Sequence, residues 1–284
     1  DVYKRQSLYL CNVMLTELTH QYKQNATRLS AQQQRASQLT MFKNTTVTRK
    51  DRLKELKERE PGYFDLEFIK AMPPAKRNRC LELLDSSKSQ LRQDVFGLAQ
   101  VDFKANGFFV EFGATDGVTL NNSWLMENEF NWQGILAEPA RSWHDDLHAN
   151  RKCRIDTRCV WRESGCQISF TEAIRGENSA ISSFMKTSRK LRGTSYSVGT
   201  VSLNELLETH EAPSIIDYIS IDTEGSEFDI LNSLDFEKWS FRTLTVEHNF
   251  AAQRHDICQL LTSKGYARVN TEVSRFDDWY VATH

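Results

Sequence analysis

Phe108-Phe109-Val110-Glu111-Phe112-Gly113-Ala114-Thr115-Asp116-Gly117 is the stretch of sequence that decides the fold. The apolar residues before Gly113 predict a short buried strand, and the two glycines, four positions apart, predict a turn at its end. The first glycine lets the backbone come within contact distance of a bound group, and the second allows the turn into the following helix. We therefore expect a ligand at the end of this strand.

Short apolar segments alternate with amphipathic segments from Gly107 onward. This alternation predicts parallel strand pairing with right-handed crossovers, and thus an α/β domain. The acidic and aromatic end of the chain suits an antiparallel final strand. The expected strands are Phe108 to Phe112, Gly134 to Glu138, Arg154 to Val160, Asp217 to Asp222, Thr243 to Glu247, Ala267 to Asn270 and Trp279 to Ala282.

Glu138 is predicted to end the second strand. A carboxylate there can accept hydrogen bonds from the ribose hydroxyls of a nucleotide. The turn at residues 113–117 nevertheless lacks the Gly-x-Gly-x-x-Gly pattern that seats a pyrophosphate on a helix N-terminus. Asp116 in that turn would repel a diphosphate, while it suits a cationic sulfonium amino acid. The residues therefore favour S-adenosylmethionine over NAD.

Several carboxylates follow a later strand, in Asp217-Tyr218-Ile219-Ser220-Ile221-Asp222-Thr223-Glu224-Gly225-Ser226-Glu227. Ligands of open α/β sheets bind at the carboxyl ends of the strands, so we expect Asp222 to lie nearest the methyl donor. Glu224 and Glu227 are candidates to orient the acceptor. A Glu in the first turn of a helix is also an ordinary structural choice.

A further strand ends in Thr245-Val246-Glu247-His248-Asn249. His248 is the candidate proton acceptor, because a hydroxyl must lose its proton as a methyl group arrives and an imidazole can take it near neutral pH. A packed or exposed histidine without chemical function is the alternative. The predicted catalytic residues are Asp222, His248 and Glu224.

Together these segments resemble the FkbM family of methyltransferases. The resemblance covers most of residues 89–284, and several ordered motifs are more specific than any one alone. The family commonly has Asn where this chain has Thr115. The motifs are Ser89-Gln90-x-x-Gln93-Asp94, Val110 to Gly117 followed by Asn122-Ser123, Trp132 to Pro139, Val201 to Leu206, Asp222 to Glu227 and Val246-Glu247.

The resemblance implies a Rossmann-like class I methyltransferase fold, with a mostly parallel seven-stranded sheet and an antiparallel final strand. It implies S-adenosylmethionine as the methyl donor and O-methylation of a sugar, glycan or secondary-metabolite hydroxyl. The donor is then expected to bind against Glu111, Gly113, Ala114, Thr115, Asp116, Gly117, Glu138 and Asp222.

Three segments are expected along the chain. Residues 86–284 form the FkbM-like methyltransferase domain. Residues 7–85 form an α-helical N-terminal region with a degraded heptad pattern, which indicates either a weak coiled coil that self-associates through residues 8–42 or a single amphipathic helix. Residues 1–6 read as the translation of a sequencing adapter, so we expect them not to belong to the protein.

The amino-acid composition of the chain limits the kinds of substrate and partner that it can bind. Residues 105–284 carry 17 Lys and Arg against 26 Asp and Glu, and such an acidic half argues against a nucleic-acid substrate. No apolar run is long enough to span a membrane, so we expect a cytoplasmic protein that acts on a small-molecule or glycan acceptor. The six cysteines form no CxxC pair, and we expect no metal site. A Mg²⁺ ion at the carboxylates of Asp222, Glu224 and Glu227 is the alternative, although nothing in their spacing demands one.

Residues 171–200 depart most from the family pattern. The basic stretch from Lys186 to Arg192 is expected in an acceptor-side lid that would suit an anionic sugar, with a mobile surface loop as the alternative. For the chain as a whole, the alternative to an enzyme is a catalytically inactive donor-binding scaffold that acts through its N-terminal helical arm.

Overall fold

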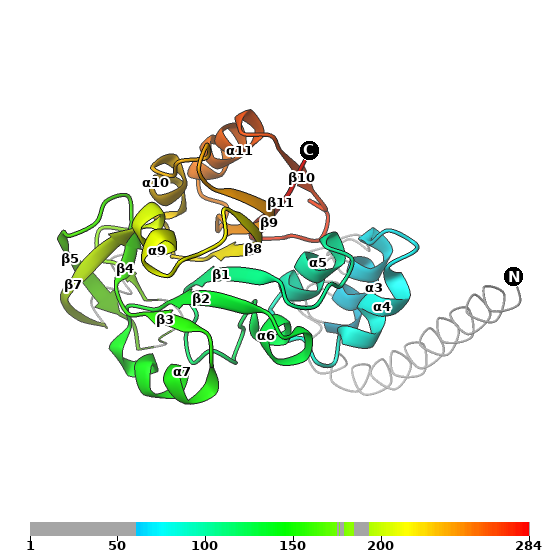
Figure 1. The fold of residues 1–284 in the computed structure, drawn as a ribbon, viewed down its shortest axis with the longest axis horizontal. Helices are drawn as coiled ribbons and strands as arrows, with labels where there is room; N and C mark the ends of the chain where they lie inside the picture. Colours follow the sequence, from blue (N-terminus) through cyan, green and yellow to red (C-terminus); the bar gives the residue numbers. More distant parts are fainter. Residues whose placement is uncertain (1–60, 175, 177–178, 185–192, 284) are drawn as a thin grey trace, which may run out of the picture. The chain divides into compact units, whose positions relative to one another are not determined.

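The computed structural model describes residues 61–174, 176, 179–184 and 193–283 (Figure 1). The chain divides into two units, residues 1–64 and 65–284, and the account below concerns the second. Helices α3 (Pro61–Ala71) and α4 (Arg77–Leu83) belong to the region expected to be helical. The predictions for residues 1–6, for self-association through residues 8–42 and for the basic stretch 186–192 lie outside the described residues.

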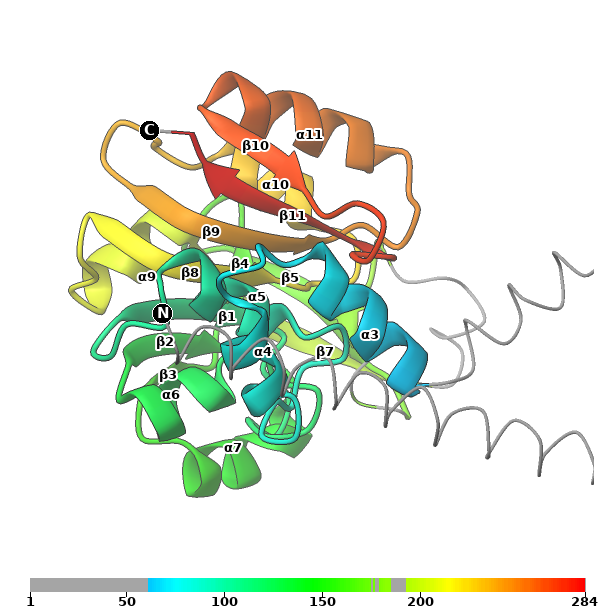
Figure 2. The same ribbon diagram turned by 90° about the vertical axis from the view of Figure 1, so that its right-hand side faces the viewer.

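A seven-stranded sheet forms the centre of the domain. Its strand order is β10-β11-β9-β8-β1-β2-β3, which can be followed from edge to edge in Figure 2. Only β11 runs antiparallel to its neighbours in this sheet, so the predicted mostly parallel sheet with an antiparallel final strand is confirmed. The strands are β1 (Phe108–Phe112), β2 (Gln133–Ala137), β3 (Arg154–Asp156), β8 (Ile215–Ile221), β9 (Ser240–Glu247), β10 (Tyr266–Val269) and β11 (Asp277–Ala282).

Helices cover both faces of this sheet. Successive side chains of a strand point to opposite faces, and β1 is buried at every position, so both of its faces must be covered. Val110 of β1 packs in an apolar cluster with α9 (Leu203–Thr209), α10 (Glu227–Asn232) and α11 (Gln253–Ser263). Phe109 faces the other way, beneath the guanidinium of Arg151. On the same side Tyr218 of β8 lies against Gly97. This second layer contains α5 (Gln93–Gln100), α6 (Trp124–Phe130) and α7 (His144–Asn150).

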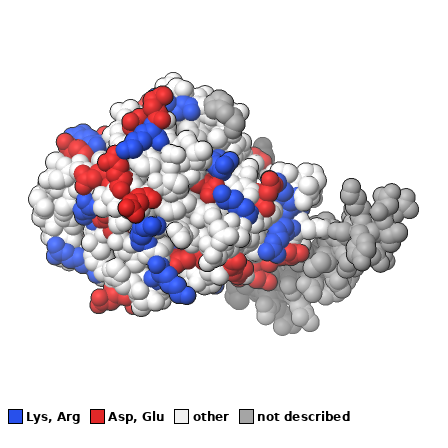
Figure 3. Space-filling view, viewed as in Figure 1, with Lys and Arg blue, Asp and Glu red and all other residues white. Residues whose placement is uncertain are grey.

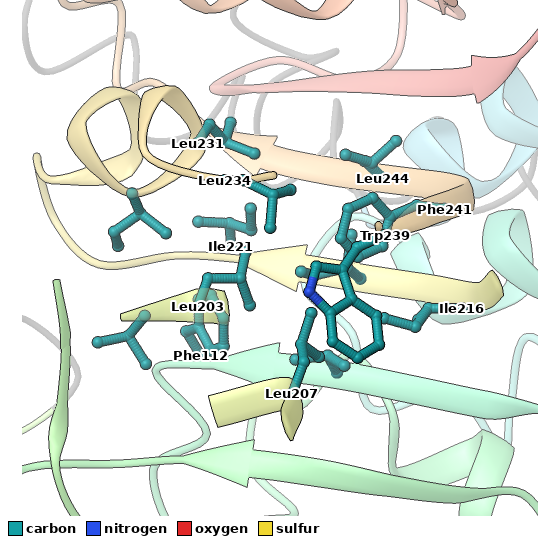
Figure 4. Packing of buried hydrophobic residues seen from close by; sticks show 14 of the residues in the cluster. Phe112, Leu203, Leu207, Ile216, Ile221, Leu231, Leu234, Trp239, Phe241 and Leu244 are labelled. Carbon is teal, nitrogen blue, oxygen red and sulfur yellow. The ribbon is translucent and has the colours of Figure 1, made fainter. Parts of the chain in front are cut away.

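The carboxyl ends of β1 and β8 are fixed by apolar packing. Phe112 and Ile221, the last residues of the two strands, are at most 1% exposed and lie in the cluster shown in Figure 4. Leu203 of α9 and Leu231 of α10 belong to the same cluster. Burial of such side chains stabilises the fold by about 1.5–3 kcal/mol each, so the edge of the sheet that carries the predicted site is rigid.

A second, four-stranded sheet has the order β4-β7-β5-β6. The prediction of one strand from Arg154 to Val160 is wrong, because the chain leaves the main sheet after Asp156 and enters the second sheet at Cys159. Asp156 Oδ1 accepts a hydrogen bond from the Arg158 N–H at 2.9 Å, a local turn that interrupts the strand. The strands are β4 (Cys159–Trp161), β5 (Gln167–Glu172), β6 (Ala180–Ile181) and β7 (Thr194–Ser202).

Acidic and basic side chains are interspersed on the face shown in Figure 3, without a continuous basic stripe. Within the described ranges, no helix combines the length and the apolar character needed to cross a bilayer.

Candidate functional site

A cavity of about 700 Å³ lies at the carboxyl ends of the parallel strands, where the strand order reverses between β1 and β8. Ligands of open α/β sheets bind at such a reversal, and cavities of about 300–1,000 Å³ hold small molecules. Strands β4, β5 and β6 of the second sheet close one side of it. Among the predicted site residues, those that line the cavity are Gly113, Thr115, Glu138, Asp222, Glu224 and His248.

Gly113 brings the end of β1 against the end of β8. Its φ is +72°, a conformation that L side chains rarely adopt, and its N–H donates to the Ala137 carbonyl oxygen at 3.1 Å. A Cβ atom at this position would lie 2.3 Å from the carbonyl oxygen of Asp222. Only glycine therefore fits here, and the close approach brings the glycine turn after β1 beside Asp222.

Glu111 was predicted to contact the donor, but it does not line the cavity. Its buried carboxylate accepts hydrogen bonds from the Asn122 N–H at 2.7 Å and from the Ser123 hydroxyl at 2.5 Å. Burial raises the pKa of Glu111, and these donors together with Arg151 oppose the shift. The side chain holds the loop before α6, so its contribution to the site is to position that loop.

Arg151 is the buried cation of the same network. Its guanidinium donates to the Gly117 carbonyl at 3.1 Å and to Asn121 Oδ1 at 2.8 Å, and it forms an ion pair with Glu127 at 2.6 Å. A Cβ atom on Gly117 would lie 2.6 Å from the Arg151 side chain. Gly117 was predicted to bind the donor, and the structure places it against Arg151 instead of at the cavity wall.

Asp116 and Ala114 also lie off the cavity wall. Asp116 Oδ1 accepts from the N–H groups of Val118 at 2.8 Å and Thr119 at 2.7 Å, which closes the turn after the glycine loop. Burial acts to raise the pKa of Asp116, but these hydrogen bonds outweigh it and the pKa lies below its ordinary value. Ala114 is fully buried. These two residues shape the turn, and neither of them lines the cavity.

Glu138 follows β2 and combines burial with access to the cavity. Only 4% of the residue is exposed, and its two oxygens accept from the Thr115 N–H at 2.9 Å and the Ala140 N–H at 2.8 Å. Burial raises its pKa to about 7, although the two N–H groups favour the charged form. Each carboxylate oxygen can accept more than one hydrogen bond, so Glu138 retains the capacity to accept two hydroxyl groups.

Asp222 and Glu247 form a pair of neighbouring carboxyl groups at the cavity wall, in which Glu247 is buried and Asp222 is half-buried. Strands β8 and β9 are parallel, with Ile221 opposite Val246. The residues that follow these two, Asp222 and Glu247, are therefore neighbours. Burial and the neighbouring carboxyl groups raise the pKa values of Asp222 and Glu247 above the ordinary range. Two adjacent carboxyl groups resist ionising together, so this arrangement favours a proton on the pair.

Glu227 and Glu224 lie in the turn between β8 and α10. Glu227 Oε1 accepts from the N–H groups of Thr223 at 3.0 Å and Gly225 at 2.9 Å, and its Oε2 accepts from Gln253 at 2.7 Å. Glu227 therefore closes the turn. This contact agrees with the alternative that Glu227 is a structural residue in the first turn of a helix. Glu224, at a φ of +57°, remains at the cavity wall as predicted.

His248 lines the cavity but has little freedom to act as a base. Its Nδ1 accepts a hydrogen bond from the Phe250 N–H at 2.9 Å, so a neutral ring carries its proton on Nε2. Nε2 lies 3.7 Å from Asp278 Oδ1 and has no hydrogen-bond partner among the described residues. Burial also lowers the pKa of His248. This geometry does not favour the predicted removal of a proton from a hydroxyl by His248.

Glu247, Asn122 and Gln93 are among the cavity residues that were not predicted as site residues. Glu247 precedes His248 on the same strand, and parallel pairing with the Asp222 strand was the signal that could have identified it. Asn122 is 7% exposed, and its Oδ1 is buried without a partner among the residues that the structure describes. Gln93 donates to Asp277 at 2.9 Å, a contact between distant segments for which the sequence holds no local signal.

The chemistry of the cavity wall fits a cationic nucleoside. The described lining residues include five Asp and Glu, and neither Lys nor Arg. Glu138 suits ribose hydroxyls, and the remaining carboxyl groups favour a positive charge in the cavity. In the described part of the chain, no group of three or more His, Cys, Asp and Glu could hold a metal ion.

The buried carboxyl groups also predict how stability depends on pH. Because their pKa values are raised, the folded state binds more protons than the unfolded state above the ordinary carboxyl range, and stability must fall as pH rises there. For Glu138 this range extends from its ordinary value of 4.5 to about 7. The carboxyl groups with raised pKa are Asp94, Glu111, Glu138, Asp222, Glu247 and Asp277.

We therefore expect the unfolding midpoint of the ligand-free protein to fall by a few degrees between about pH 5.5 and about pH 8. Scanning calorimetry across this range measures the slope. The Glu138→Gln variant should show a shallower slope, because one of the titrating groups is gone. A midpoint that rises with pH over the same range would contradict the assignment of raised pKa values.

Comparison with known proteins supports one family. The family model described as the methyltransferase FkbM domain matches residues 111–267. Among solved structures, a precorrin-6y C5,15-methyltransferase from Geobacter metallireducens is 10% identical, with a TM-score of 0.38 over 66% of this chain and 85% of that one. A SAM-dependent methyltransferase from Aquifex aeolicus is 9% identical, with a TM-score of 0.34 over 72% and 96% of the two chains. No curated sequence matches the chain.

Proposed function

Because this chain belongs to the FkbM methyltransferase family, we propose that it transfers a methyl group from S-adenosylmethionine to the oxygen of a sugar, glycan or secondary-metabolite hydroxyl. The observation that carries the proposal is the buried Glu138 carboxyl at the wall of a cavity that no described Lys or Arg lines. The cytoplasmic location expected from the sequence belongs to the same proposal.

The donor side of the cavity is built by the ends of β1 and β2. When bound, S-adenosylmethionine supplies a methyl group activated on a sulfonium. Glu138 would hold the ribose through its two oxygens, and the Gly113 turn would admit the ligand close to the backbone. Asp222 and Glu224 would stabilise its positive charge. Thr115, whose N–H already orients Glu138, has its side chain at the same wall.

The acceptor side is assigned to the wall formed by the second sheet. Phe170 and Ile181 offer apolar surface there, and Phe184 follows β6 and lies beside Gly225, close to the turn after Asp222. A sugar or a similar ring presents both apolar C–H faces and hydroxyl groups, so it suits such a cavity. Holding the acceptor oxygen in line with the methyl group is the main contribution that this wall can make to the rate.

A labelled methyl-transfer assay tests the function. The full chain is incubated with methyl-labelled S-adenosylmethionine and a panel of free sugars, nucleotide-linked sugars and phenolic metabolites. We expect label in an alkali-stable methyl ether on at least one hydroxyl acceptor, and none with the Glu138→Gln protein. Label found only on nitrogen acceptors, or only as alkali-labile methyl esters, would contradict O-methylation of a hydroxyl.

A further inference from the structure

We propose that Asp222 and Glu247 act as one acid–base pair that takes the proton of the acceptor hydroxyl during methyl transfer. The inference rests on the proposed function, and it assigns a step of that reaction to two carboxyl groups instead of to His248. It also predicts that binding of the cationic donor changes the protonation of the pair.

The strand register creates the pair. Asp222 and Glu247 stand side by side at the carboxyl edge of β8 and β9, and Asp277 of β11 lies opposite Glu247 in the antiparallel register. Asp277 accepts from Gln93 at 2.9 Å and does not line the cavity. Of these three adjacent carboxyl groups, therefore, two line the cavity, and the register of β8 and β9 makes these two neighbours.

Three other ionisable groups at the wall already accept hydrogen bonds from the backbone. Glu227 accepts from the N–H groups of Thr223 and Gly225, and His248 Nδ1 accepts from the Phe250 N–H. Glu138 lies at the end of β2, where its oxygens accept two backbone N–H groups. The Asp222–Glu247 pair differs from these three groups because no backbone hydrogen bond of a turn depends on its charge.

A second buried polar group points to a ligand at the same place. Asn122 lines the cavity with 7% of its surface exposed, and its side-chain nitrogen donates to Ser220 at 2.9 Å. Its Oδ1 has no partner within the described part of the chain. A buried acceptor without a partner is costly, and a ligand N–H or O–H would relieve that cost.

The charges around the pair determine when it is protonated. Glu224, Glu227 and Asp277 face it from the turn after β8, from α10 and from β11, and all three are acidic. Burial and these neighbours favour protonation of both members in the ligand-free protein. A sulfonium cation in the cavity favours loss of one proton, which leaves the carboxylate that the reaction requires.

The proposed step balances in atoms and charge. The bond between the acceptor oxygen and the methyl carbon forms as the bond between that carbon and sulfur breaks, and the electron pair of the broken bond stays on sulfur. The hydroxyl proton passes to the carboxylate of the pair, which then holds two protons. The sulfur product is a neutral thioether, so the pair stays protonated until the next donor binds.

Proton-linked titration calorimetry tests the pair without an acceptor. The full chain is titrated near neutral pH with S-adenosylmethionine, and separately with the neutral thioether S-adenosylhomocysteine, in two buffers of different ionisation enthalpy. Any proton that Glu138 releases on meeting the ribose is common to the two ligands, so we expect the sulfonium to release about one proton more than the thioether. Infrared difference spectra should show loss of a protonated carboxyl band with the first ligand only.

Substitutions at Asp222 and Glu247 test whether these residues are the source of the released proton. Glu247→Gln and Asp222→Asn preserve the shape of the side chain. We expect both variants to bind the donor and to release far fewer protons per bound donor than the wild type. Asp217→Asn is the matched control, because Asp217 is a buried carboxyl on the same strand whose Oδ2 accepts from the Phe108 N–H at the opposite edge of the sheet. This variant should release protons as the wild type does.

Each outcome decides between the two proposals. If the sulfonium and the thioether bind with equal proton release, the acid–base pair is wrong, while the methyltransferase function stands. If neither ligand binds to the folded wild-type chain, the proposed donor site fails first. The wild-type comparison of the two ligands decides the matter even if one of the variants does not fold.

Discussion

Replacing Glu138 by Gln is expected to weaken binding of S-adenosylmethionine by about 100-fold, because hydrogen bonds to a charged acceptor contribute about 1.5–3 kcal/mol each. The Gln amide has a single acceptor oxygen, and the N–H groups of Thr115 and Ala140 already compete for it. Its NH₂ group would meet the ribose hydroxyls in place of a carboxylate oxygen. Titration calorimetry of the variant gives the change in affinity directly.

Glu172→Gln is the control for this experiment. Glu172 lies on β5 of the second sheet, where it accepts from the Tyr196 hydroxyl at 2.6 Å, and it does not line the cavity. We expect donor affinity close to that of the wild type. If Glu138→Gln and Glu172→Gln bound the donor equally well, Glu138 would not be the ribose acceptor.

Gly113→Ala is expected to lower the free energy of unfolding by about 4 kcal/mol, the largest effect on stability that we predict. Part of the loss comes from the φ of +72°, which costs an L residue about 1–2 kcal/mol. The rest comes from the new Cβ atom 2.3 Å from the Asp222 carbonyl oxygen, which would force β1 and β8 apart. Denaturant unfolding monitored by circular dichroism measures the loss.

Gly165→Ala separates the two contributions. Gly165 has a similar φ of +77°, but a Cβ atom there would have nothing within 4 Å. Its substitution should therefore cost only the backbone strain, about 1–2 kcal/mol. Equal losses for the two variants would mean that the contact between β1 and β8 is not tight, and that the geometry assigned to the donor turn is wrong.

The central strands of the main sheet could be predicted from sequence because they are apolar runs, as in β1 and β8. The break after Asp156 was missed because Cys159 and Val160 resume an apolar pattern after two intervening residues, while the side chain of Asp156 turns the backbone. The second sheet was missed for another reason. Its strand Gln167–Glu172 has few buried residues, so it lacks the apolar pattern that predicts a strand.

The predicted site residues that line the cavity include those that follow a strand directly. Gly113, Glu138 and Asp222 occupy the cavity wall because the carboxyl ends of parallel strands meet at one edge. Glu111 does not line the cavity, because its carboxylate accepts from Ser123, a contact across twelve residues that no local sequence pattern reveals. Distance along the chain also concealed the pairing of Asp222 with Glu247, which only the strand register makes apparent.

The central claim is that the cavity between β1, β2 and β8 binds S-adenosylmethionine. The most direct measurement is a calorimetric titration of the full chain with S-adenosylmethionine and, in parallel, with NAD. We expect micromolar binding of S-adenosylmethionine and no binding of NAD, since the turn at residues 113–117 has no Gly-x-Gly-x-x-Gly to seat a pyrophosphate. Binding of NAD alone, or of neither ligand by a folded protein, would contradict the account.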